Sequence, residues 1–207
     1  MDKKTLIIVV VAGLAIAAAV TRLVVTQSSG SSRTNMKPYE HLGLVAAQET
    51  AKLVANQGSV TVVLEVMEGV KNPNHEAQLK GFKAGLGKGA SLKLASVQEL
   101  KRDMTVDPRT WSPNQAAQIV GMGAGASAVV LFASFPQALS PEDVAVLKAN
   151  KGKLVVIATR TPAIDLLISQ DIVQVAIAGR TPPKPPSGGT ESTVQWFDRT
   201  YEILRSK

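Results

Sequence analysis

The feature that most constrains this chain is an unbroken apolar run near its N-terminus, LIIVVVAGLAIAAAV, at residues 6–20. No charged side chain interrupts the run, whereas Asp2, Lys3 and Lys4 precede it and Arg22 follows it. A segment of this composition partitions into a lipid bilayer, and the polar chain beyond it does not. The sequence therefore predicts that the rest of the chain is either tethered to a membrane or exported across one.

Two interpretations of the run are open, because its length lies near the boundary between a signal-peptide core and a spanning helix. Ala17 and Ala19 form a small-x-small cleavage pattern before Val20, as in a signal peptide. Apolar residues resume after Arg22, however, so a helix over residues 5–25 would be about 30 Å long and would match the bilayer core. We favour a retained anchor whose membrane-embedded side chains are Leu6, Ile7, Ile8, Val9, Val10, Val11, Leu14, Ile16 and Val20.

The charges before the run predict the orientation of that anchor. Lys3 and Lys4 form a short basic tail, and such tails usually stay in the cytoplasm. We therefore expect a single-pass protein with a cytoplasmic N-terminus and a soluble domain in a periplasmic or other extracytoplasmic space. The chain has no cysteine, which fits both oxidising and reducing compartments and decides nothing.

Composition predicts the domain organisation beyond the anchor or signal peptide, which takes residues 1–25. The Ser/Gly-rich residues 26–37 predict a flexible linker, and residues 38–180 are enough for one α/β domain with a real core. The TPPKPPSGG segment at residues 181–189 predicts a second linker. Residues 190–207 predict a C-terminal amphipathic helix, because apolar side chains recur there at helical spacing: Val194, Phe197, Tyr201 and Leu204.

Short apolar runs alternate with helical patterns within the predicted domain. The runs SVTVVLEV, SLKLASV, ASAVVLFA, KLVVIAT and IVQVAIA are rich in Val, Ile and Leu, as expected of strands that are covered on both faces. Strands separated by helices predict a parallel sheet with right-handed crossovers. We therefore expect a transmembrane helix followed by a single Rossmann-like, three-layer α/β domain with a five-stranded, mainly parallel sheet.

The expected helix starts share one pattern, in which a capping residue is followed by proline. Ser, Thr and Asn accept hydrogen bonds from free backbone N–H groups, and proline at the first helical position loses no hydrogen bond. Gln115 stands three residues after Ser112 and predicts a capping box there. The four helix starts are Asn72-Pro73, Ser112-Pro113, Ser140-Pro141 and Thr161-Pro162.

The sequence carries no motif for catalysis, metal binding or nucleic-acid binding. The glycines of Gly121–Gly125 follow a helical pattern and precede a strand, which is the reverse of a dinucleotide-binding loop. His41 and His75 are the only histidines, and no cysteine joins them in a zinc site. The formal charge of +7 is scattered, without an aromatic stripe. We expect a non-enzymatic protein with no cofactor, no metal and no nucleic-acid partner.

Three segments carry a family resemblance: NHEAQLKGFKAGL, then GASAVVLFA, then KLVVIATRTPAIDLLISQDIVQVAIAGRTP. Together they resemble one lobe of the type I periplasmic binding proteins, the sugar-binding fold shared with LacI-type repressors. Gly81-Phe82 looks like the Gly-Phe pair at the centre of that family's first helix. The resemblance covers chiefly residues 59–182 and implies a substrate-binding lobe. Family members have two such lobes, and these residues match one.

The chain departs from that family at three positions where sugar is usually held. Glu76 stands where the family has an arginine, and Pro136 and Thr159 stand near positions where it has aspartates. A sugar pocket depends on a few placed hydrogen-bonding groups. The resemblance therefore does not carry the family's polar sugar contacts over to this chain.

A ligand of such a fold is expected at the carboxyl ends of the parallel strands, where helix N-termini converge. The candidate ligand-binding residues are Glu65, Asn72, Asn74, His75, Glu76, Ser134, Phe135, Thr159, Arg160 and Thr161. We expect a membrane-anchored module that acts through protein contacts or weak small-molecule binding, with lipid and a protein partner or second copy as its contacts. The alternative is an accessory subunit of a membrane complex without a ligand pocket.

Overall fold

The apolar runs of the sequence form strands of one sheet in the computed structural model, which describes residues 35–67, 72–87, 91–103, 105–107, 109–185 and 191–207. The α/β unit extends from Met36 to Lys207. The predicted anchor lies outside the described residues. Among the helices that are described, none combines the length and the apolar character needed to cross a bilayer.

Six strands make up the sheet, in the spatial order β2-β1-β3-β4-β5-β6. Strands β1 to β5 run parallel to their neighbours, and β6 pairs with β5 in the antiparallel direction. β2 lies on one side of β1, and β3 and the later strands lie on the other side. The strand order therefore reverses between β1 and β3, and their carboxyl ends form a topological switch point. The strands are β1 Gly58–Val66, β2 Leu92–Lys101, β3 Ala128–Phe132, β4 Lys153–Thr159, β5 Val175–Gly179 and β6 Tyr201–Arg205.

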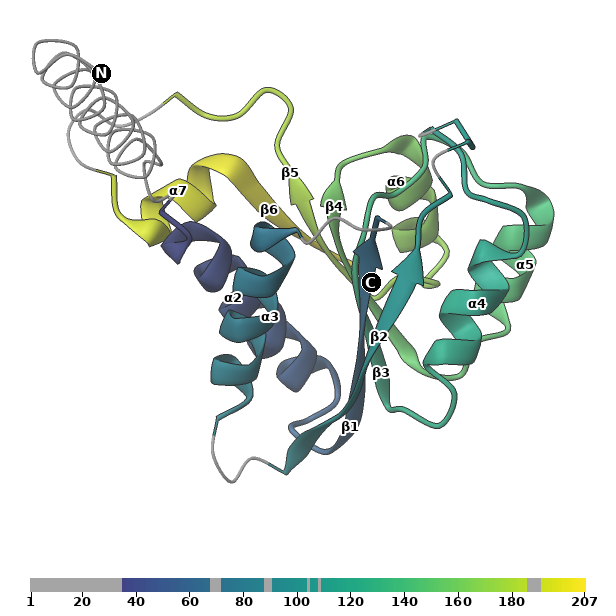
Figure 1. Ribbon diagram of the computed structural model, residues 1–207, viewed down its shortest axis with the longest axis horizontal. Helices are drawn as coiled ribbons and strands as arrows, with labels where there is room; N and C mark the ends of the chain where they lie inside the picture. Colours follow the sequence, from purple (N-terminus) through teal and green to yellow (C-terminus); the bar gives the residue numbers. More distant parts are fainter. Residues whose placement is uncertain (1–34, 68–71, 88–90, 104, 108, 186–190) are drawn as a thin grey trace, which may run out of the picture. The chain divides into compact units, whose positions relative to one another are not determined.

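Helices cover both faces of the sheet (Figure 1), so the predicted three-layer α/β architecture is confirmed. α2, α3 and α7 pack with one apolar cluster, and α4, α5 and α6 pack with the other. Every side chain of the central strand β3 is buried, as its continuous apolar sequence predicts. The helices are α2 Lys37–Leu53, α3 Pro73–Leu86, α4 Gln115–Met122, α5 Pro141–Lys148, α6 Pro162–Ser169 and α7 Thr193–Thr200.

Glycines allow α2 and α3 to approach each other at backbone distance. A Cβ atom on Gly43 would lie 1.8 Å from the carbonyl oxygen of Gln78, and one on Gly81 would lie 1.8 Å from that of Glu40. Both distances are far below a van der Waals contact, so no side chain fits at either position. The contact holds the first turns of α3 in place beside the sheet.

The predicted five-stranded sheet and the predicted helix over residues 190–207 are wrong at the C-terminus. The structure has a short helix, α7, followed directly by a sixth strand, β6. The apolar side chains of this segment fit helical spacing, but they also alternate along a strand. Leu204 packs on one face of the sheet, and Tyr201 and Ile203 pack on the other. Pairing with the open edge of β5 satisfies the backbone of β6 and decides between the two patterns.

Three of the four predicted helix caps are present, and the predicted capping box at Ser112 is not. Asn72, Ser140 and Thr161 cap their helices through side-chain acceptors, as expected. At Ser112, only the backbone N–H takes part, donating to Gln115 Oε1 at 2.9 Å, and α4 begins two residues after Pro113. The structure places a full capping box at α7 instead, between Ser192 and Gln195.

Candidate functional site

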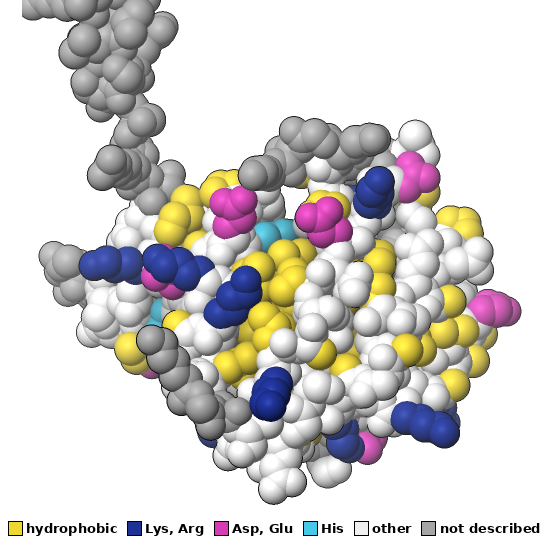
Figure 2. Space-filling view, turned by 60° about the horizontal axis from the view of Figure 1, so that its bottom comes forward, with side chains coloured by type: hydrophobic (Ala, Val, Ile, Leu, Met, Phe, Trp, Pro, Cys, Tyr) yellow, Lys and Arg dark blue, Asp and Glu magenta, His cyan; other side chains and the backbone are white. Residues whose placement is uncertain are grey.

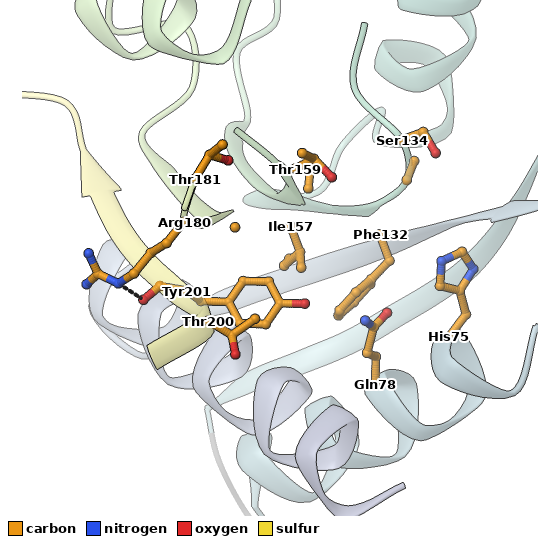
Figure 3. Close-up of a pocket in the computed structure, with 13 residues that line it drawn as sticks. His75, Gln78, Phe132, Ser134, Ile157, Thr159, Arg180, Thr181, Thr200 and Tyr201 are labelled. Atoms are coloured by element: carbon orange, nitrogen blue, oxygen red, sulfur yellow. Dashed lines mark hydrogen bonds between the residues drawn. The ribbon is translucent and has the colours of Figure 1, made fainter. Parts of the chain in front are cut away.

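A cavity of about 410 Å³ opens at the carboxyl edge of the sheet, above β3, β4 and β5. This volume lies within the usual range of small-molecule sites. Figure 3 shows that helix α3 borders one side and the junction of α7 and β6 borders the other. The residues that line the cavity are His75, Gln78, Phe132, Ala133, Ser134, Ile157, Ala158, Thr159, Gly179, Arg180, Thr181, Thr200 and Tyr201.

The floor of the cavity is apolar and rigid. Phe132 is the last residue of β3 and pairs directly with Ile157 of β4. Phe132 is fully buried, and its ring meets the ring of Phe82 edge to face at a centroid distance of 6.1 Å. Because both side chains belong to the core, the floor is formed before any ligand arrives.

Two polar side chains of α3 face the cavity from the first turns of the helix. Nδ1 of His75 lies 2.9 Å from the carbonyl oxygen of Glu65. A carbonyl only accepts, so Nδ1–H donates this hydrogen bond, and Nε2 is left for a contact with a ligand. Gln78 is almost fully buried, and Figure 3 shows its side chain beside Phe132. Its amide offers both a donor and an acceptor.

Tyr201 closes the opposite side of the cavity. It is the first residue of β6 and pairs with Gly179 at the end of β5, so the antiparallel strand brings it to the carboxyl edge. Its ring stacks on Phe197 at 5.7 Å, and Figure 3 shows its hydroxyl directed across the cavity toward Phe132 and Gln78. Burial raises the pKa of the Tyr201 phenol, and Tyr39 adds to this shift. The phenol therefore keeps its proton at neutral pH and can donate a hydrogen bond.

The charged groups near the cavity form ion pairs and hydrogen bonds with one another and with the backbone. Arg180 borders the cavity, but its guanidinium points away from it in Figure 3 and donates to the Tyr201 carbonyl oxygen at 2.9 Å. The same guanidinium donates to Glu202 at 3.2 Å. Glu202 in turn accepts from Arg160 at 2.6 Å, and Arg160 also binds Asp165. The remaining polar groups of the lining are neutral hydroxyls, an amide and an imidazole.

Three of the residues expected to bind ligand come together at this cavity: His75, Ser134 and Thr159. Glu65 lies beside them but is engaged, because its carboxylate accepts from the backbone N–H of Ser134 at 3.0 Å and from the Ser134 hydroxyl at 2.8 Å. Arg102 approaches the same carboxylate at 3.8 Å. Glu65 therefore positions the loop after β3 and does not line the cavity.

The other expected residues lie outside the lining. Asn72 and Thr161 cap α3 and α6, and Phe135 is buried against Trp111 at a centroid distance of 4.9 Å. Arg160 belongs to the ion pairs with Asp165 and Glu202. The two others lie on the first turn of α3, where neither borders the cavity: Asn74 and Glu76.

Several lining residues were not predicted from the sequence. The sequence predicts a continuous helix at Thr200 and Tyr201, and only the change from α7 to β6 between them brings both to the cavity. Gln78 gave a weak signal, as a polar residue one turn before the Gly-Phe pair on the buried face of α3. The hydroxyl of Thr200 is buried and has no hydrogen-bond partner among the described residues.

The side chains that line the cavity can hold a small molecule by hydrogen bonds and apolar contacts. Within the described ranges, no three His, Cys, Asp or Glu side chains gather into a possible metal site. The carboxylates beside this cavity are paired with arginine or hydroxyl groups, so these carboxylates are not free to act as a general base. An apolar floor surrounded by neutral donors and acceptors is typical of a small-molecule binding pocket.

Comparison with known proteins supports the fold. No protein-family model matches this chain, and no curated protein matches it either. Among solved structures, a solute-binding protein of an ABC transporter from Burkholderia graminis, in complex with D-arabinose, is similar with a TM-score of 0.50 and 16% identity. The similarity covers 67% of this chain and 46% of that chain. The expected resemblance to one lobe of a solute-binding protein is therefore confirmed for the fold.

Two further structures show lower scores. AraP, an arabinose-binding protein from Geobacillus stearothermophilus, gives a TM-score of 0.49 and 20% identity, over 68% of this chain and 45% of that chain. A chain of the XylFII-LytSN complex gives a TM-score of 0.48 and 18% identity, over 68% of this chain and 48% of that chain. This chain thus spans less than half the length of each of these structures.

Proposed function

We propose that this chain is a membrane-tethered, non-enzymatic module that binds a small, neutral, hydroxyl-rich molecule at the carboxyl edge of its sheet. The observation that carries this proposal is the cavity of about 410 Å³, in which neutral polar groups surround an apolar floor. The family resemblance implied that this chain lacks the usual sugar contacts. The cavity offers a different set of contacts, chiefly Gln78, Tyr201 and His75.

The arrangement of the lining favours an uncharged ligand. The amide of Gln78 and the hydroxyls of Thr159, Thr181 and Tyr201 both donate and accept hydrogen bonds, as sugar hydroxyls do. Phe132, Ile157 and Ala158 together give an apolar surface for the C–H face of a ring. A charged ligand would need an unpaired counter-charge in the lining, and Arg180 is held by Glu202 and by backbone carbonyl groups. We therefore rank sugars before amino acids.

The membrane tether rests on the apolar run at residues 6–20, which lies outside the described part of the chain. An extracytoplasmic position of the domain follows from the basic residues that precede the run. A module of this kind would capture a solute close to the membrane and present it to a protein partner there. The alternative, an accessory subunit without a ligand, predicts that no compound fills the cavity.

The binding proposal is tested by thermal unfolding of the intact chain in mild detergent, with pentoses, hexoses, nucleosides and amino acids as probes. A ligand at 100 times its Kd stabilises a protein by about 2.7 kcal/mol, which shifts the melting temperature of a domain of this size by several degrees. We expect such a shift for a sugar. Gln78→Ala should abolish the shift, and Gln118→Ala, on the exposed surface of α4, should leave it unchanged. No shift with any probe would favour the accessory-subunit alternative.

The tether is tested separately, by alkaline extraction of membranes that contain the intact chain. A spanning helix resists extraction, whereas a protein held only by surface contacts is released. We expect the chain to stay in the membrane pellet with its N-terminal sequence intact. Release of the chain, or an N-terminus that begins after Ala19, would show that the run is not a retained anchor.

A further inference from the structure

An apolar patch lies between α3 and the edge strand β2. Figure 2 shows hydrophobic side chains gathered at the centre of this face, with acidic side chains at its upper margin and Lys or Arg side chains at its left and lower margins. Val97 of β2 is 36% exposed at the patch. Around it lie partly exposed side chains that continue the core cluster of this face: Leu64, Leu79, Leu86 and Leu94.

The edge of β2 is protected against strand addition, so the patch is not a site for another strand. β2 pairs with β1 alone among the described strands, which leaves its other edge open. Its register to β1 shifts between Val60 and Thr61, and Lys93 is exposed on it. Irregular pairing and edge lysines oppose the addition of a further strand. The accessible apolar surface is therefore the face of α3 and β2, and not the strand edge.

On α3, one acidic and one basic side chain border the patch near opposite ends of the helix. Glu76 and Lys83 are both exposed and stand seven residues apart, which is about 10 Å along a helix. Neither has an ion-pair partner among the described residues. Lys80, by contrast, points to the other side of α3 and binds Glu40 of α2 at 2.7 Å. The apolar rim of α3, at Leu79 and Leu86, thus has a free acidic group near one end and a free basic group near the other.

We propose that a second copy of this chain packs on this patch, with α3 of one protomer antiparallel to α3 of its partner. A two-fold axis that crosses α3 near Leu79 would place Glu76 opposite the partner subunit's Lys83, and Lys83 opposite the partner subunit's Glu76. The patch is complementary to itself in this arrangement, as a two-fold interface requires. A parallel arrangement would bring like charges together, which disfavours it.

The apolar and charged groups have different roles in this interface. Burial of Val97, Leu79 and their neighbours supplies the stabilisation, because apolar surface leaves water. The pairs of Glu76 and Lys83 select the antiparallel orientation, since rim charges mainly determine specificity. The interface involves neither the cavity nor the apolar run at residues 6–20, so it stands or fails independently of the proposed function.

Charge reversal tests the interface. The intact chain in mild detergent is examined by size-exclusion chromatography with light scattering over a range of concentrations. We expect a dimer whose dissociation constant rises at least tenfold in Glu76→Lys and in Lys83→Glu. The double variant E76K/K83E should recover the dimer, because the swapped charges again face each other. Lys148→Glu, on α5 at the other face of the sheet, should have no effect.

Three outcomes would overturn the proposal. They are a chain that is monomeric at all concentrations, single reversals with unchanged dissociation constants, and a double variant as weak as the single variants. The last outcome would show that the side chains act on folding or on another contact. A merely structural effect of each residue predicts no recovery in the double variant.

Cross-linking tests the antiparallel orientation directly, because the chain has no cysteine of its own. Glu76→Cys chains mixed with Lys83→Cys chains should form a disulfide-linked pair on mild oxidation. Each variant alone should remain mostly uncross-linked, because identical positions lie apart in the antiparallel pair. Equal cross-linking of either variant with itself would contradict the arrangement.

Discussion

The carboxylate of Glu49 accepts two hydrogen bonds from the guanidinium of Arg205, with Oε2 at 3.1 Å from Nε and 2.7 Å from Nη2. The contact joins α2, the first described helix, to β6, the last strand. The Glu49 side chain is 5% exposed, whereas that of Arg205 is 55% exposed. Lys52 donates to the other carboxylate oxygen at 2.7 Å. The buried acid is therefore neutralised by two basic groups that reach water.

Arg205→Ala should lower the free energy of unfolding by about 1–2 kcal/mol. A hydrogen bond to a charged group contributes more than a neutral one, but the exposure of Arg205 reduces its value. Lys52→Ala, which removes the more exposed partner, should cost less than about 0.5 kcal/mol. Urea unfolding at pH 7 measures both variants. An equal cost for the two would show that Arg205 does not hold β6 to α2.

The same pair predicts a pH dependence. Burial alone would raise the pKa of the Glu49 carboxyl, but hydrogen bonds from Lys52 and Arg205 outweigh burial and hold this pKa below its usual value. The pair's contribution to stability is thus complete above about pH 4.3, the usual pKa of glutamate, and is lost as the pH falls through the lowered pKa. The cost of Arg205→Ala should be smaller at pH 3 than at pH 7. A cost that is larger at pH 3 than at pH 7 would contradict a lowered pKa of the Glu49 carboxyl.

The close approach of α2 and α3 predicts opposite effects for two glycine substitutions. Gly81→Ala places a methyl group 1.8 Å from the Glu40 carbonyl oxygen and must push the helices apart, at a cost of at least about 2 kcal/mol. Gly121→Ala, in α4, meets nothing within 4 Å and should stabilise the protein by about 0.5–1 kcal/mol. Thermal unfolding of the two variants checks the signs. Tolerance of alanine at Gly81 would show that the helices are not in backbone contact.

The helix caps give a third pair of variants. Thr161 is buried, and its hydroxyl oxygen accepts from the N–H of Ile164, so Thr161→Ala should cost about 1 kcal/mol or more. Ser112 caps no helix through its side chain, and Ser112→Ala should change stability by less than about 0.5 kcal/mol. Chemical unfolding compares the two. A larger loss at Ser112 would restore the capping box that the sequence suggested there.

The parallel part of the fold could be predicted from the sequence because local signals agreed with one another. Continuous Val- and Ile-rich runs predicted buried strands, and the capping residues before Pro73, Pro141 and Pro162 predicted the helix starts. The last strand could not be predicted in this way. Tyr201 and Leu204 fit a helical face as well as a strand, and only the open edge of β5, a tertiary feature, makes the strand the better choice.

The site was predictable only where it follows from strand topology. Thr159 ends β4, Ser134 closely follows β3, and His75 lies in the first turn of the helix that follows β1. Because parallel strands end at one edge, the meeting of these residues could be foreseen. The sequence does not predict whether a charged side chain faces the cavity, because the ion-pair partner of that side chain comes from a distant segment. Arg160 shows this, since Glu202 of β6 holds its guanidinium.

The measurement that tests the central claim most directly is calorimetric titration of the intact chain in mild detergent with a panel of free pentoses and hexoses, D-arabinose included. The account predicts saturable binding of at least one sugar to one site, about five- to tenfold weaker in Tyr201→Phe, because the variant loses one hydrogen bond to the ligand. Tyr39 packs against Trp196 outside the cavity, so Tyr39→Phe should bind as the parent chain does. Absence of binding for every sugar, or equal affinity in Tyr201→Phe, would contradict the assignment of this cavity as the ligand site.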